Sequence, residues 1–553
     1  MAAPGKIILS FIGRNKWLML AALIASLASN FLNVLLPLSI GKFYEITLPD
    51  SGSVKGKLME LLPFEINSAR RFFIFFGCLI LLKVLFAFFE KFGTGVVTER
   101  FARRIRERVF AAQLSHTLAA HRSKPVGKYL LRYSGDLRTV QNYLSRGILS
   151  FAGDVFFMIC AFTGLWLINP YLTVIALVTF SMAGAVIFFL SRRMRNASVE
   201  RRNQRSKALD FVSSRLSGFY TIKSFNRESV EEELYDHRSR KQYNAGVEYI
   251  RVQSFIQALM PGFFFGALAL MLVMILKLGE GGAQPGFGDV FVFVLLFLYM
   301  QGVTRRLLRV NIIWQEGKIS LAKLDSLLNQ PLEKRVNSEA LIETKGGITF
   351  KNVSYSYDEK QVLKNVSFTI QPGSLVLIKG KQGSGKSTLL KMIQKIYEPQ
   401  QGEILIDSLN YNALSPFEIR KEVTLVSAET PLIGNTVFRA VSYRDTGDRR
   451  ENASKMLEKL NIRLAENEYE NLDFRLDENA KNISDGQKIM LQFARALLTG
   501  KKIILLDEPF HNLDTASREI IVEQLNKLRD KRTIILISDY VPSGLAISQT
   551  IQL

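Results

Sequence analysis

Hydrophobic residues are distributed unevenly along this chain. Up to about residue 310 they form long runs with few interruptions, whereas from about residue 340 to 553 they form short, strand-like runs separated by helical patterns. The first region therefore predicts membrane-spanning helices, and the second predicts a globular domain of alternating strands and helices. We expect a membrane all-α region followed by an α/β domain.

Six of the apolar runs are long enough to be membrane spans. About 20 apolar residues in a helix cross a hydrocarbon core of roughly 30 Å, and an even number of crossings returns the chain to the side on which it began. The spans are predicted at about 17–43, 72–93, 147–168, 171–190, 253–276 and 289–308.

The connections between the predicted spans differ greatly in length. Asn169-Pro170 forms a tight turn, whereas the two connections on the other side of the membrane contain roughly 50 and 60 residues with helical periodicity and charged faces. We expect the spans to continue as helices beyond the membrane, at about 1.5 Å per residue. Each of these helical arms is interrupted, near 118–125 and near 216–226.

The net charge of +22 reflects where the basic residues lie. Residues 98–146 contain eleven Lys or Arg against three acidic residues, and residues 192–251 contain fourteen, whereas residues 44–70 contain three against four acidic residues. Basic residues of membrane proteins concentrate in cytoplasmic loops, so we expect both long arms in the cytoplasm. This distribution accounts for the charge without a nucleic-acid partner, and none is expected.

Three charged residues, Lys83, Glu90 and Asp154, lie within or beside the predicted spans. A charge inside a membrane is a candidate functional site, although a position in the cytoplasmic half also permits a purely structural role. Lys83 and Asp154 lie at similar depth, so one expectation is that they pair. The two cysteines, Cys78 and Cys160, lie in apolar runs and predict neither a zinc site nor a disulfide framework.

The segment LVLIKGKQGSGKST contains a complete P-loop pattern between a strand-like run and a helical one. Its glycines allow backbone N–H groups to surround phosphates, Lys386 reaches the outer phosphates, and the Ser387 hydroxyl is a Mg²⁺ ligand. The predicted nucleotide-contacting residues of this segment are Gly380, Gly383, Ser384, Gly385, Lys386, Ser387 and Thr388.

About 120 residues later, the segment KKIILLDEP places two acidic residues directly after a short apolar run. Such a run is typical of a buried parallel strand, whose C-terminal end delivers side chains to a ligand. We expect Asp507 to hold the metal, usually through water, and Glu508 to act as the general base for the attacking water.

With these motifs, the chain resembles a half-transporter of the ABC exporter superfamily, in which six spans precede one nucleotide-binding domain. The resemblance covers nearly the whole chain and rests on the P-loop, on LLDEP and on three further segments. These are ISDGQ at 483–487, NLD at 512–514 and the join SLAKLDSLLNQP. The implied domains are a transmembrane domain at 1–325, a linker at 326–342 and a nucleotide-binding domain at 343–553.

The resemblance also assigns roles to residues outside the P-loop. Tyr357 would stack on adenine, and the breaks near 118–125 and 216–226 would be the coupling helices that transmit domain closure. Two nucleotide-binding domains would pair head to tail around two ATP molecules, each held between one P-loop and the other chain's signature segment. The implied signature residues are Ser484, Gly486 and Gln487, and Asp514 would contribute to the same site.

Three positions depart from the family pattern, and all of them concern nucleotide handling. Ala428 occupies the place of a glutamine that contacts the metal and the attacking water, and Asp539 occupies the place of a histidine that contacts the γ-phosphate. Asp485 replaces the first glycine of the signature, where a carboxylate about 6 Å from a phosphate charge would oppose binding by roughly 3 kcal/mol. Glu508 is retained, which favours hydrolysis.

These features predict an ABC-type ATPase, weakened by the three departures, that uses ATP and Mg²⁺ to export or flip an amphipathic substrate by alternating access. The substrate would be a lipid, a peptide or a hydrophobic compound. We expect the divergent subunit of a heterodimer with a second half-transporter, in contact with membrane lipid; the alternatives are a homodimer with slow sites and an ATP-binding membrane scaffold without transport. The expected location is a bacterial inner membrane, with the N-terminus and the nucleotide-binding domain in the cytoplasm.

Overall fold

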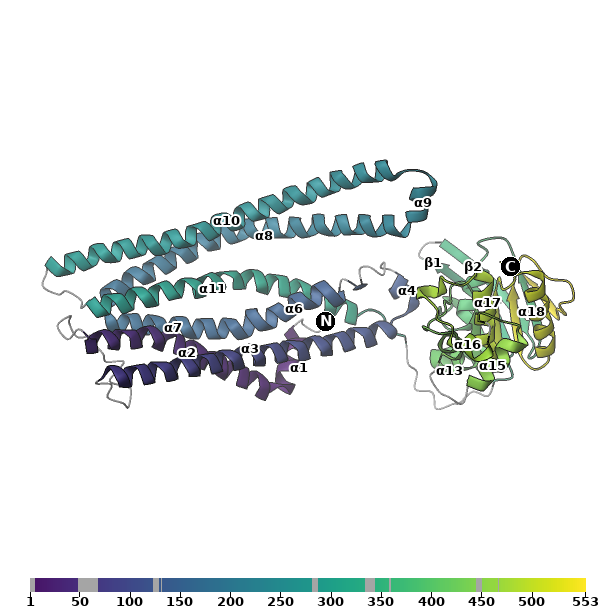
Figure 1. Cartoon of the computed structure of the whole chain (residues 1–553). Helices are drawn as coiled ribbons and strands as arrows, with labels where there is room; N and C mark the ends of the chain where they lie inside the picture. Colours follow the sequence, from purple (N-terminus) through teal and green to yellow (C-terminus); the bar gives the residue numbers. More distant parts are fainter. Residues whose placement is uncertain are drawn as a thin grey trace. The chain divides into compact units, whose positions relative to one another are not determined.

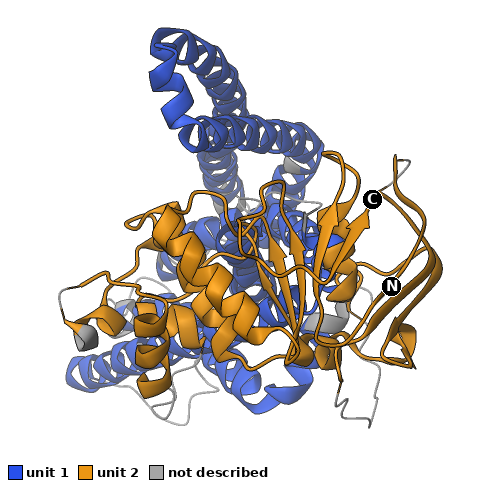
Figure 2. Cartoon of the chain, turned by 90° about the vertical axis from the view of Figure 1, so that its right-hand side faces the viewer, with its two compact units in different colours: residues 1–330 blue, residues 331–553 orange. Residues whose placement is uncertain are grey.

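The computed structural model of the chain describes residues 5–47, 68–122, 129–130, 132–280, 287–333, 344–357, 360–443, 450–465 and 467–553. The chain divides into two compact units, residues 1–330 and residues 331–553, which are coloured separately in Figure 2. Each unit is described by itself.

The first unit consists of helices only. Six of the helices in its described part are long and apolar enough to cross a membrane, as the sequence predicts, and each predicted span falls within one of them. Figure 1 labels the elements, which are α1 (Gly5–Arg14), α2 (Lys16–Thr47), α3 (Ala69–Leu114), α4 (Leu118–Arg122), η2 (Arg132–Asp136), α6 (Leu137–Leu144), η3 (Ser145–Ser150), α7 (Phe151–Ile168), α8 (Pro170–Ser217), α9 (Phe219–Ser224), α10 (Glu228–Glu280) and α11 (Phe287–Leu328).

The reversal between α7 and α8 is made by one residue. Asn169 has extended backbone angles, ends α7, and accepts a hydrogen bond from the N–H of Leu172 at the start of α8. Pro170 follows as the first residue of α8, where its missing N–H costs no helical hydrogen bond. The predicted tight turn at Asn169-Pro170 is therefore a shared helix cap.

The helices extend far beyond the predicted spans. Helix α8 has 48 residues and α10 has 53, and they run side by side to a short turn built from α9 (Figure 1). α10 contains Pro261 in its interior. The predicted break near 216–226 therefore exists as a short helix, and the break near 118–125 begins with α4, while residues 123–128 lie outside the described part of the chain.

The apolar core of the bundle is rich in aromatic rings. Phe157, Phe264 and Phe297 are almost completely buried, and the rings of Phe264 and Phe297 lie 5.0 Å apart. These contacts hold α7, α10 and α11 together at the level of the spans. Many apolar side chains of α3 are exposed, as expected for a helix that faces lipid or another chain.

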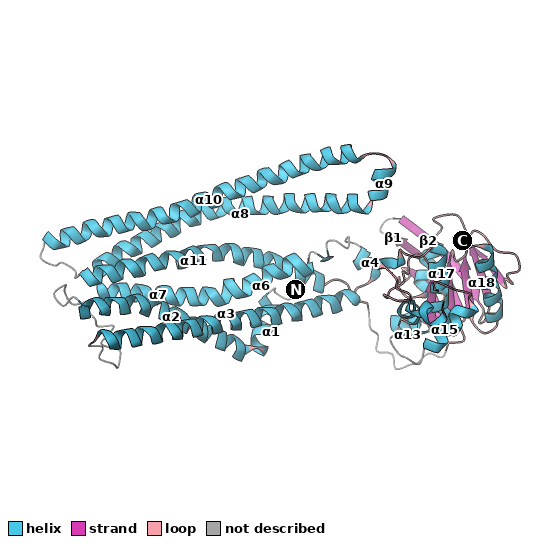
Figure 3. Ribbon diagram, viewed as in Figure 1, coloured by secondary structure: helices cyan, strands magenta, loops and turns pink. Residues whose placement is uncertain are grey.

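The second unit contains two sheets with helices around them (Figure 3). One sheet is antiparallel, with strand order β2-β1-β4-β5, and the other is parallel, with order β6-β7-β8-β3-β9. The strands are β1 (Ile348–Tyr357), β2 (Lys360–Ile370), β3 (Leu375–Lys379), β4 (Gln401–Ile406), β5 (Leu409–Asn410), β6 (Val423–Val426), β7 (Ile503–Asp507), β8 (Thr533–Ile537) and β9 (Gln549–Gln552).

The three central strands of the parallel sheet, β7, β8 and β3, are almost entirely buried, because helices cover them. The helical elements of this unit are α12 (Lys386–Ile393), η4 (Tyr411–Ala413), α13 (Pro416–Glu422), α14 (Val437–Ser442), α15 (Arg450–Lys459), α16 (Glu468–Asp473), η6 (Glu478–Ala480), α17 (Asp485–Leu498) and α18 (Thr515–Leu528). β7, β8 and β3 are neighbours, so the loops after their C-terminal ends meet at one edge of the sheet. This edge carries the candidate site.

Candidate functional site

The loop between β3 and α12 has a conformation that depends on glycine. Gly383 and Gly385 have φ angles of 83° and 95°, which other residues rarely adopt. A Cβ atom at Gly385 would lie 2.6 Å from the Leu363 side chain, and one at Gly380 would lie 2.6 Å from the Ser384 hydroxyl. The glycines therefore allow the loop to turn closely around a small volume.

Two polar groups of this loop point to an anionic ligand. The ammonium of Lys386 donates a hydrogen bond to the Gly380 carbonyl at 2.6 Å, which holds it over the loop. The Ser384 hydroxyl is buried and makes no hydrogen bond to the described residues. A cation and an unsatisfied donor beside a helix N-terminus form a suitable cradle for phosphate.

The two acidic residues after the apolar run lie beside the loop. Asp507 is the last residue of β7, and its carboxylate accepts a hydrogen bond from Ser387. Glu508 has a φ angle of 51°, a strained value for this residue type, and its N–H donates to the Ile537 carbonyl at 2.9 Å. Its carboxylate accepts a hydrogen bond from the Asp539 N–H at 3.2 Å, and the Ser538 hydroxyl oxygen lies 3.5 Å from it.

Both carboxyl groups hold their protons more tightly than ordinary acids. Burial raises the pKa of Asp507, against the opposing effects of the Ser387 hydrogen bond and the Lys391 charge. Burial also raises the pKa of Glu508, and the negative charges of Asp539 and Asp507 raise it further. A raised carboxyl pKa beside a phosphate-type loop is typical of a site that handles protons.

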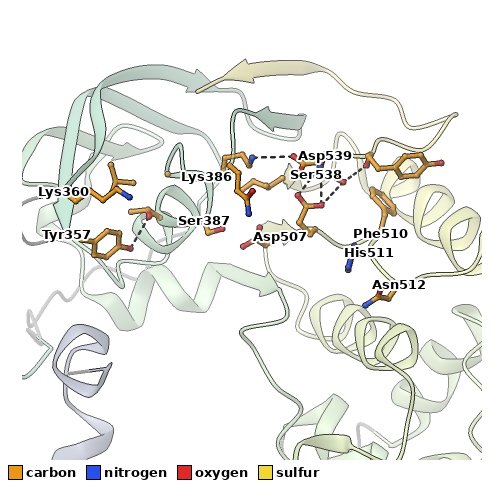
Figure 4. A pocket seen from close by; sticks show the side chains of 18 of the residues that line it. Tyr357, Lys360, Lys386, Ser387, Asp507, Phe510, His511, Asn512, Ser538 and Asp539 are labelled. Atoms are coloured by element: carbon orange, nitrogen blue, oxygen red, sulfur yellow. Dashed lines mark hydrogen bonds and ion pairs between the residues drawn. The ribbon is translucent and has the colours of Figure 1, made fainter. Parts of the chain in front are cut away.

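Tyr357 lies at the opposite end of the same pocket (Figure 4). Its hydroxyl is 3.2 Å from the hydroxyl of Thr388 in α12, and its ring packs edge-on against the rings of Tyr355 and Tyr397. Because these contacts fix the ring while leaving it partly exposed, it presents a preformed aromatic surface to a ligand.

The pocket has a volume of about 1110 Å³ and brings together most of the predicted nucleotide residues. Predicted residues in its lining are Tyr357, Gly383, Gly385, Lys386, Ser387, Thr388, Asp507 and Glu508. Gly380 and Ser384, which lie in close contact with each other, are not among the lining residues. Ser484, Gly486, Gln487 and Asp514 do not line it either.

The segment ISDGQ forms the start of α17. The Ser484 hydroxyl accepts a hydrogen bond from the Gln487 N–H at 3.1 Å, and the Gln487 side chain accepts one from the Ser484 N–H at 2.9 Å, which is a complete capping box. A Cβ atom at Gly486 would lie 2.7 Å from the Asn512 carbonyl, so this position needs glycine. Asp514 caps α18 through the Ser517 N–H at 2.7 Å.

The unusual acid of this segment is paired within its own helix. The carboxylate of Asp485 lies 2.9 Å from the Lys488 ammonium, and its side chain is 68% exposed. It also lines a second cavity of about 390 Å³, together with Ala428, Asp507 and Glu508. Lys488 therefore supplies a counter-charge beside Asp485, one turn further along α17.

The other two departures also lie at this edge of the sheet. Ala428 is exposed in the turn after β6, and the neighbouring Glu429 forms an ion pair of 2.7 Å with Lys391 of α12. Asp539 follows β8, and its carboxylate lies 3.6 Å from the Lys386 ammonium (Figure 4). The acid at the histidine position therefore contacts the P-loop lysine directly.

Several lining residues were not predicted from the sequence, among them Lys360, Arg518 and Tyr540. Lys360 lies next to Tyr357 across the β1–β2 pairing, and the Arg518 guanidinium lies 5.3 Å from the centre of the Tyr540 ring. Tyr540 directly follows Asp539, and Arg518 lies four residues after Asp514. Their proximity in the sequence to these residues could have indicated that they line the same pocket.

The charged residues of the spans form contacts that differ from the expected pairing of Lys83 with Asp154. Asp154 instead binds Arg306 of α11, whereas the Lys83 ammonium donates to the carbonyl and hydroxyl oxygens of Ser29 at 2.9 and 2.8 Å. The expected pairing was wrong because α2 packs against both α3 and α7 and supplies closer partners for Lys83. Glu90 accepts a hydrogen bond from the Ser26 hydroxyl at 3.1 Å.

The residues around the loop fit Mg²⁺ held together with phosphate. Ser387 and Asp507 provide neighbouring hard oxygen donors, whereas the described part of the chain contains no group of three or more His, Cys, Asp or Glu residues arranged for a metal. Mg²⁺ is typically held by one or two protein ligands, by phosphates and by water rather than by a full protein cage.

This fold and this site define a membrane protein driven by nucleotide binding. Residues 19–304 match the ABC transporter transmembrane region, and residues 363–511 match the ABC transporter domain. The chain therefore belongs to the ABC transporters, as a half-transporter of the exporter type. It is an integral membrane protein with an ATP-binding ATPase domain coupled to export, and half-transporters of this kind function as dimers.

Several relatives align with most of the chain. It is 25% identical over 466 residues to an ATP-dependent lipid A-core flippase of Pasteurella multocida, covering 83% of this chain and 80% of the relative. It is 26% identical over 452 residues to the alpha-hemolysin translocation ATP-binding protein HlyB of Escherichia coli, covering 80% and 62%. A solved bacterial Atm1-family ABC exporter with ATP bound has the same fold, with a TM-score of 0.82, 21% identity, and coverage of 98% of this chain and 93% of that one.

Proposed function

We propose that this chain is the divergent subunit of a heterodimeric exporter that moves an amphipathic substrate across a bacterial inner membrane. The observation that carries the proposal is the combination of Glu508, held beside the P-loop, with three altered nucleotide positions in the same domain. A homodimer would carry Ala428, Asp485 and Asp539 in both of its sites, which would slow both.

The proposed roles of the site residues follow from their contacts. Lys386 and the loop from Gly380 to Thr388 bind the phosphates of ATP, and Tyr357 stacks on the adenine. Ser387 and Asp507 hold Mg²⁺, which when bound would neutralise charge on the outer phosphates. Glu508 accepts a proton from the attacking water, and its fixed carboxylate and raised pKa support that role.

The signature residues act on the other chain's nucleotide in this proposal. Ser484, Gly486, Gln487 and Asp514 lie outside the pocket of their own P-loop, which supports a role toward a partner's ATP. The capping box keeps the Ser484 hydroxyl at the start of α17, where the helix dipole favours an anion. Asp485 weakens that partner site, and Lys488 offsets part of its charge.

An amphipathic substrate is supported by polar contacts inside an apolar bundle. Charged groups lie among membrane-spanning helices that are rich in aromatic residues. They are the pair Asp154–Arg306 and the side chains of Lys83 and Glu90, which contact serines of α2. Relatives named for lipid A-core and for alpha-hemolysin are in keeping with an amphipathic cargo. The basic arms support a cytoplasmic location for the nucleotide-binding domain.

Basal ATP hydrolysis by the purified, full-length chain tests the proposal. We expect turnover well below that of a typical exporter and an increase when a partner half-transporter is added. Turnover of ordinary rate by this chain alone, lost in Glu508→Gln, would contradict the heterodimer and favour a homodimer. Accessibility labels in α10 and α11 that do not respond to nucleotide would contradict transport.

A further inference from the structure

Asp539 occupies the space beside the P-loop lysine. The Lys386 ammonium has two close oxygen partners, the Gly380 carbonyl at 2.6 Å and the Asp539 carboxylate at 3.6 Å. The Lys386 side chain is only 13% exposed, whereas that of Asp539 is 85% exposed, so the acid approaches the lysine from the open side of the pocket. A ligand that reaches Lys386 enters from the side on which Asp539 lies.

Hydrogen bonds fix the backbone of Asp539 beside the P-loop. Its N–H donates to both oxygens of the Glu508 carboxylate, at 3.2 and 3.4 Å. The preceding Ser538 hydroxyl donates to the Tyr540 carbonyl and closes a tight turn at the end of β8. The carboxylate cannot leave Lys386 by a simple shift of the loop without breaking these contacts.

The pocket near Lys386 is already rich in negative charge before a nucleotide phosphate is added. Three carboxylates, those of Asp507, Glu508 and Asp539, line the pocket near Lys386. Of the other cations, Lys391 is already paired with Glu429, and Arg518 lies over the Tyr540 ring. Lys360 lies at the Tyr357 end of the pocket (Figure 4). A terminal phosphate would therefore have to share Lys386 with Asp539.

We propose that Asp539 is a specificity-determining residue that disfavours the γ-phosphate of a nucleoside triphosphate. The carboxylate therefore shifts the preference of this site from the triphosphate toward the diphosphate. The inference rests on the proposed nucleotide site and concerns its preference alone. The inner phosphates lie in the glycine loop in both nucleotides and are affected equally. The γ-phosphate, which only the triphosphate has, is the group that competes with Asp539 for Lys386.

The effect should be stronger in the closed transporter than in the open domain. Asp539 is mostly exposed in the described structure, and water screens its charge. A partner domain that covers the pocket would exclude water and strengthen the repulsion. Asp539 would then make a triphosphate in this site costly in the state that drives transport, and the site would hold a diphosphate for a larger part of the cycle.

Competitive displacement of a fluorescent ADP analogue by unlabelled ADP and by AMP-PNP tests the inference without hydrolysis. The experiment uses the purified full-length chain with Mg²⁺. Relative to wild type, Asp539→Asn should strengthen AMP-PNP binding by about tenfold and change ADP binding by less than about twofold. Asp539→Glu should keep the wild-type preference, because the negative charge is retained.

Asp530→Asn is the matched control. Asp530 is 84% exposed and has a basic neighbour, Arg529, at 3.8 Å, but it lies before β8, at the other end of that strand from Asp539. We expect it to leave both affinities unchanged. An equal change of both affinities in Asp539→Asn, or no change, would overturn the inference. A wild-type chain that binds neither nucleotide would overturn the proposed site itself and the inference with it.

Discussion

The guanidinium of Arg306 binds the carboxylate of Asp154 through three hydrogen bonds, of 2.6, 3.0 and 3.1 Å, and so joins α11 to α7 inside the bundle. The two partners are not equally buried: the Asp154 side chain is 7% exposed, and that of Arg306 is 56% exposed. Removing the arginine leaves a buried carboxylate without its counter-charge, whereas removing the carboxylate leaves an arginine whose side chain is more than half exposed.

We therefore expect Arg306→Gln to destabilise the protein more than Asp154→Asn, by about 1–3 kcal/mol against less than about 1 kcal/mol. The thermal unfolding midpoint of the detergent-solubilised chain measures the difference. The double variant should recover most of the loss, and Arg309→Gln, on the same helix, serves as control. Equal effects of the two single variants would show that burial does not determine the cost of breaking this pair.

A second prediction concerns Ala428. Because Ala428 is exposed in a turn, Ala428→Gln should fold normally and place an amide at the cavity that Asp507 and Glu508 line. We expect ATP turnover to rise by about tenfold, since a positioned polar group aids the attacking water. Glu429→Gln introduces an amide one residue away and breaks the pair with Lys391, so it should not raise turnover. A rise in both variants would argue against a specific role of position 428.

The raised pKa of Glu508 predicts the acid limb of the pH–rate profile. A general base must be ionised, so turnover should fall, as pH decreases, at a higher pH than an ordinary glutamate would give. Burial is the main cause of the raised pKa, and the charges of Asp539 and Asp507 add to it, while the hydrogen bond from the Asp539 N–H and the charge of Lys386 oppose it. Removing one charge in Asp539→Asn should therefore move the acid limb of turnover to lower pH.

The raised pKa of Glu508 affects turnover and stability in opposite directions: turnover increases as pH rises, whereas the contribution of this group to the free energy of unfolding decreases. The folded state holds the Glu508 proton more tightly than the unfolded state, so this group stabilises the fold at low pH, and that contribution is lost as pH rises from the ordinary glutamate pKa through the raised one.

A pH–rate profile for Asp539→Asn that matches wild type, or moves to higher pH, would contradict the proposed effect of the Asp539 charge.

Asp485 gives the fourth prediction. Asp485→Gly removes a negative charge from the signature and should raise ATP affinity or turnover at the site that α17 closes. It also removes a favourable acid from the first turn of α17 and should cost about 0.5–1 kcal/mol of stability. Lys488→Ala, which removes the counter-charge, should change nucleotide affinity in the opposite direction. If neither variant changes affinity or turnover, Asp485 does not act on the nucleotide.

The sequence was sufficient to predict residues whose neighbours along the chain determine their place. Asp507 ends a short apolar run that is typical of a buried strand, and the glycines of the P-loop lie between a strand and a helix. The structure brings Asp507, Gly383 and Gly385 into one pocket, and the matching family regions confirm the class of protein.

Contacts between distant segments were not available from periodicity. Asp154 and Arg306 are 152 positions apart, and their pairing depends on which helices are neighbours in the bundle. The contact of Asp539 with Lys386 likewise requires β8 and β3 to be adjacent in the sheet, although many residues separate them in the chain. Strand order and helix packing decide such contacts, and neither can be read from a local pattern.

Pro261 gives α10 a defined point of weakness. A proline lacks the N–H that would bond to the carbonyl four residues earlier, that of Gln257, so one backbone hydrogen bond is missing about two thirds of the way along this 53-residue helix. At about 1.5 Å per residue, the helix is about 80 Å long. A bend of a few degrees at Pro261 would displace the far end of α10 by several ångströms. A single residue therefore determines where the two parts of this helix can move relative to each other.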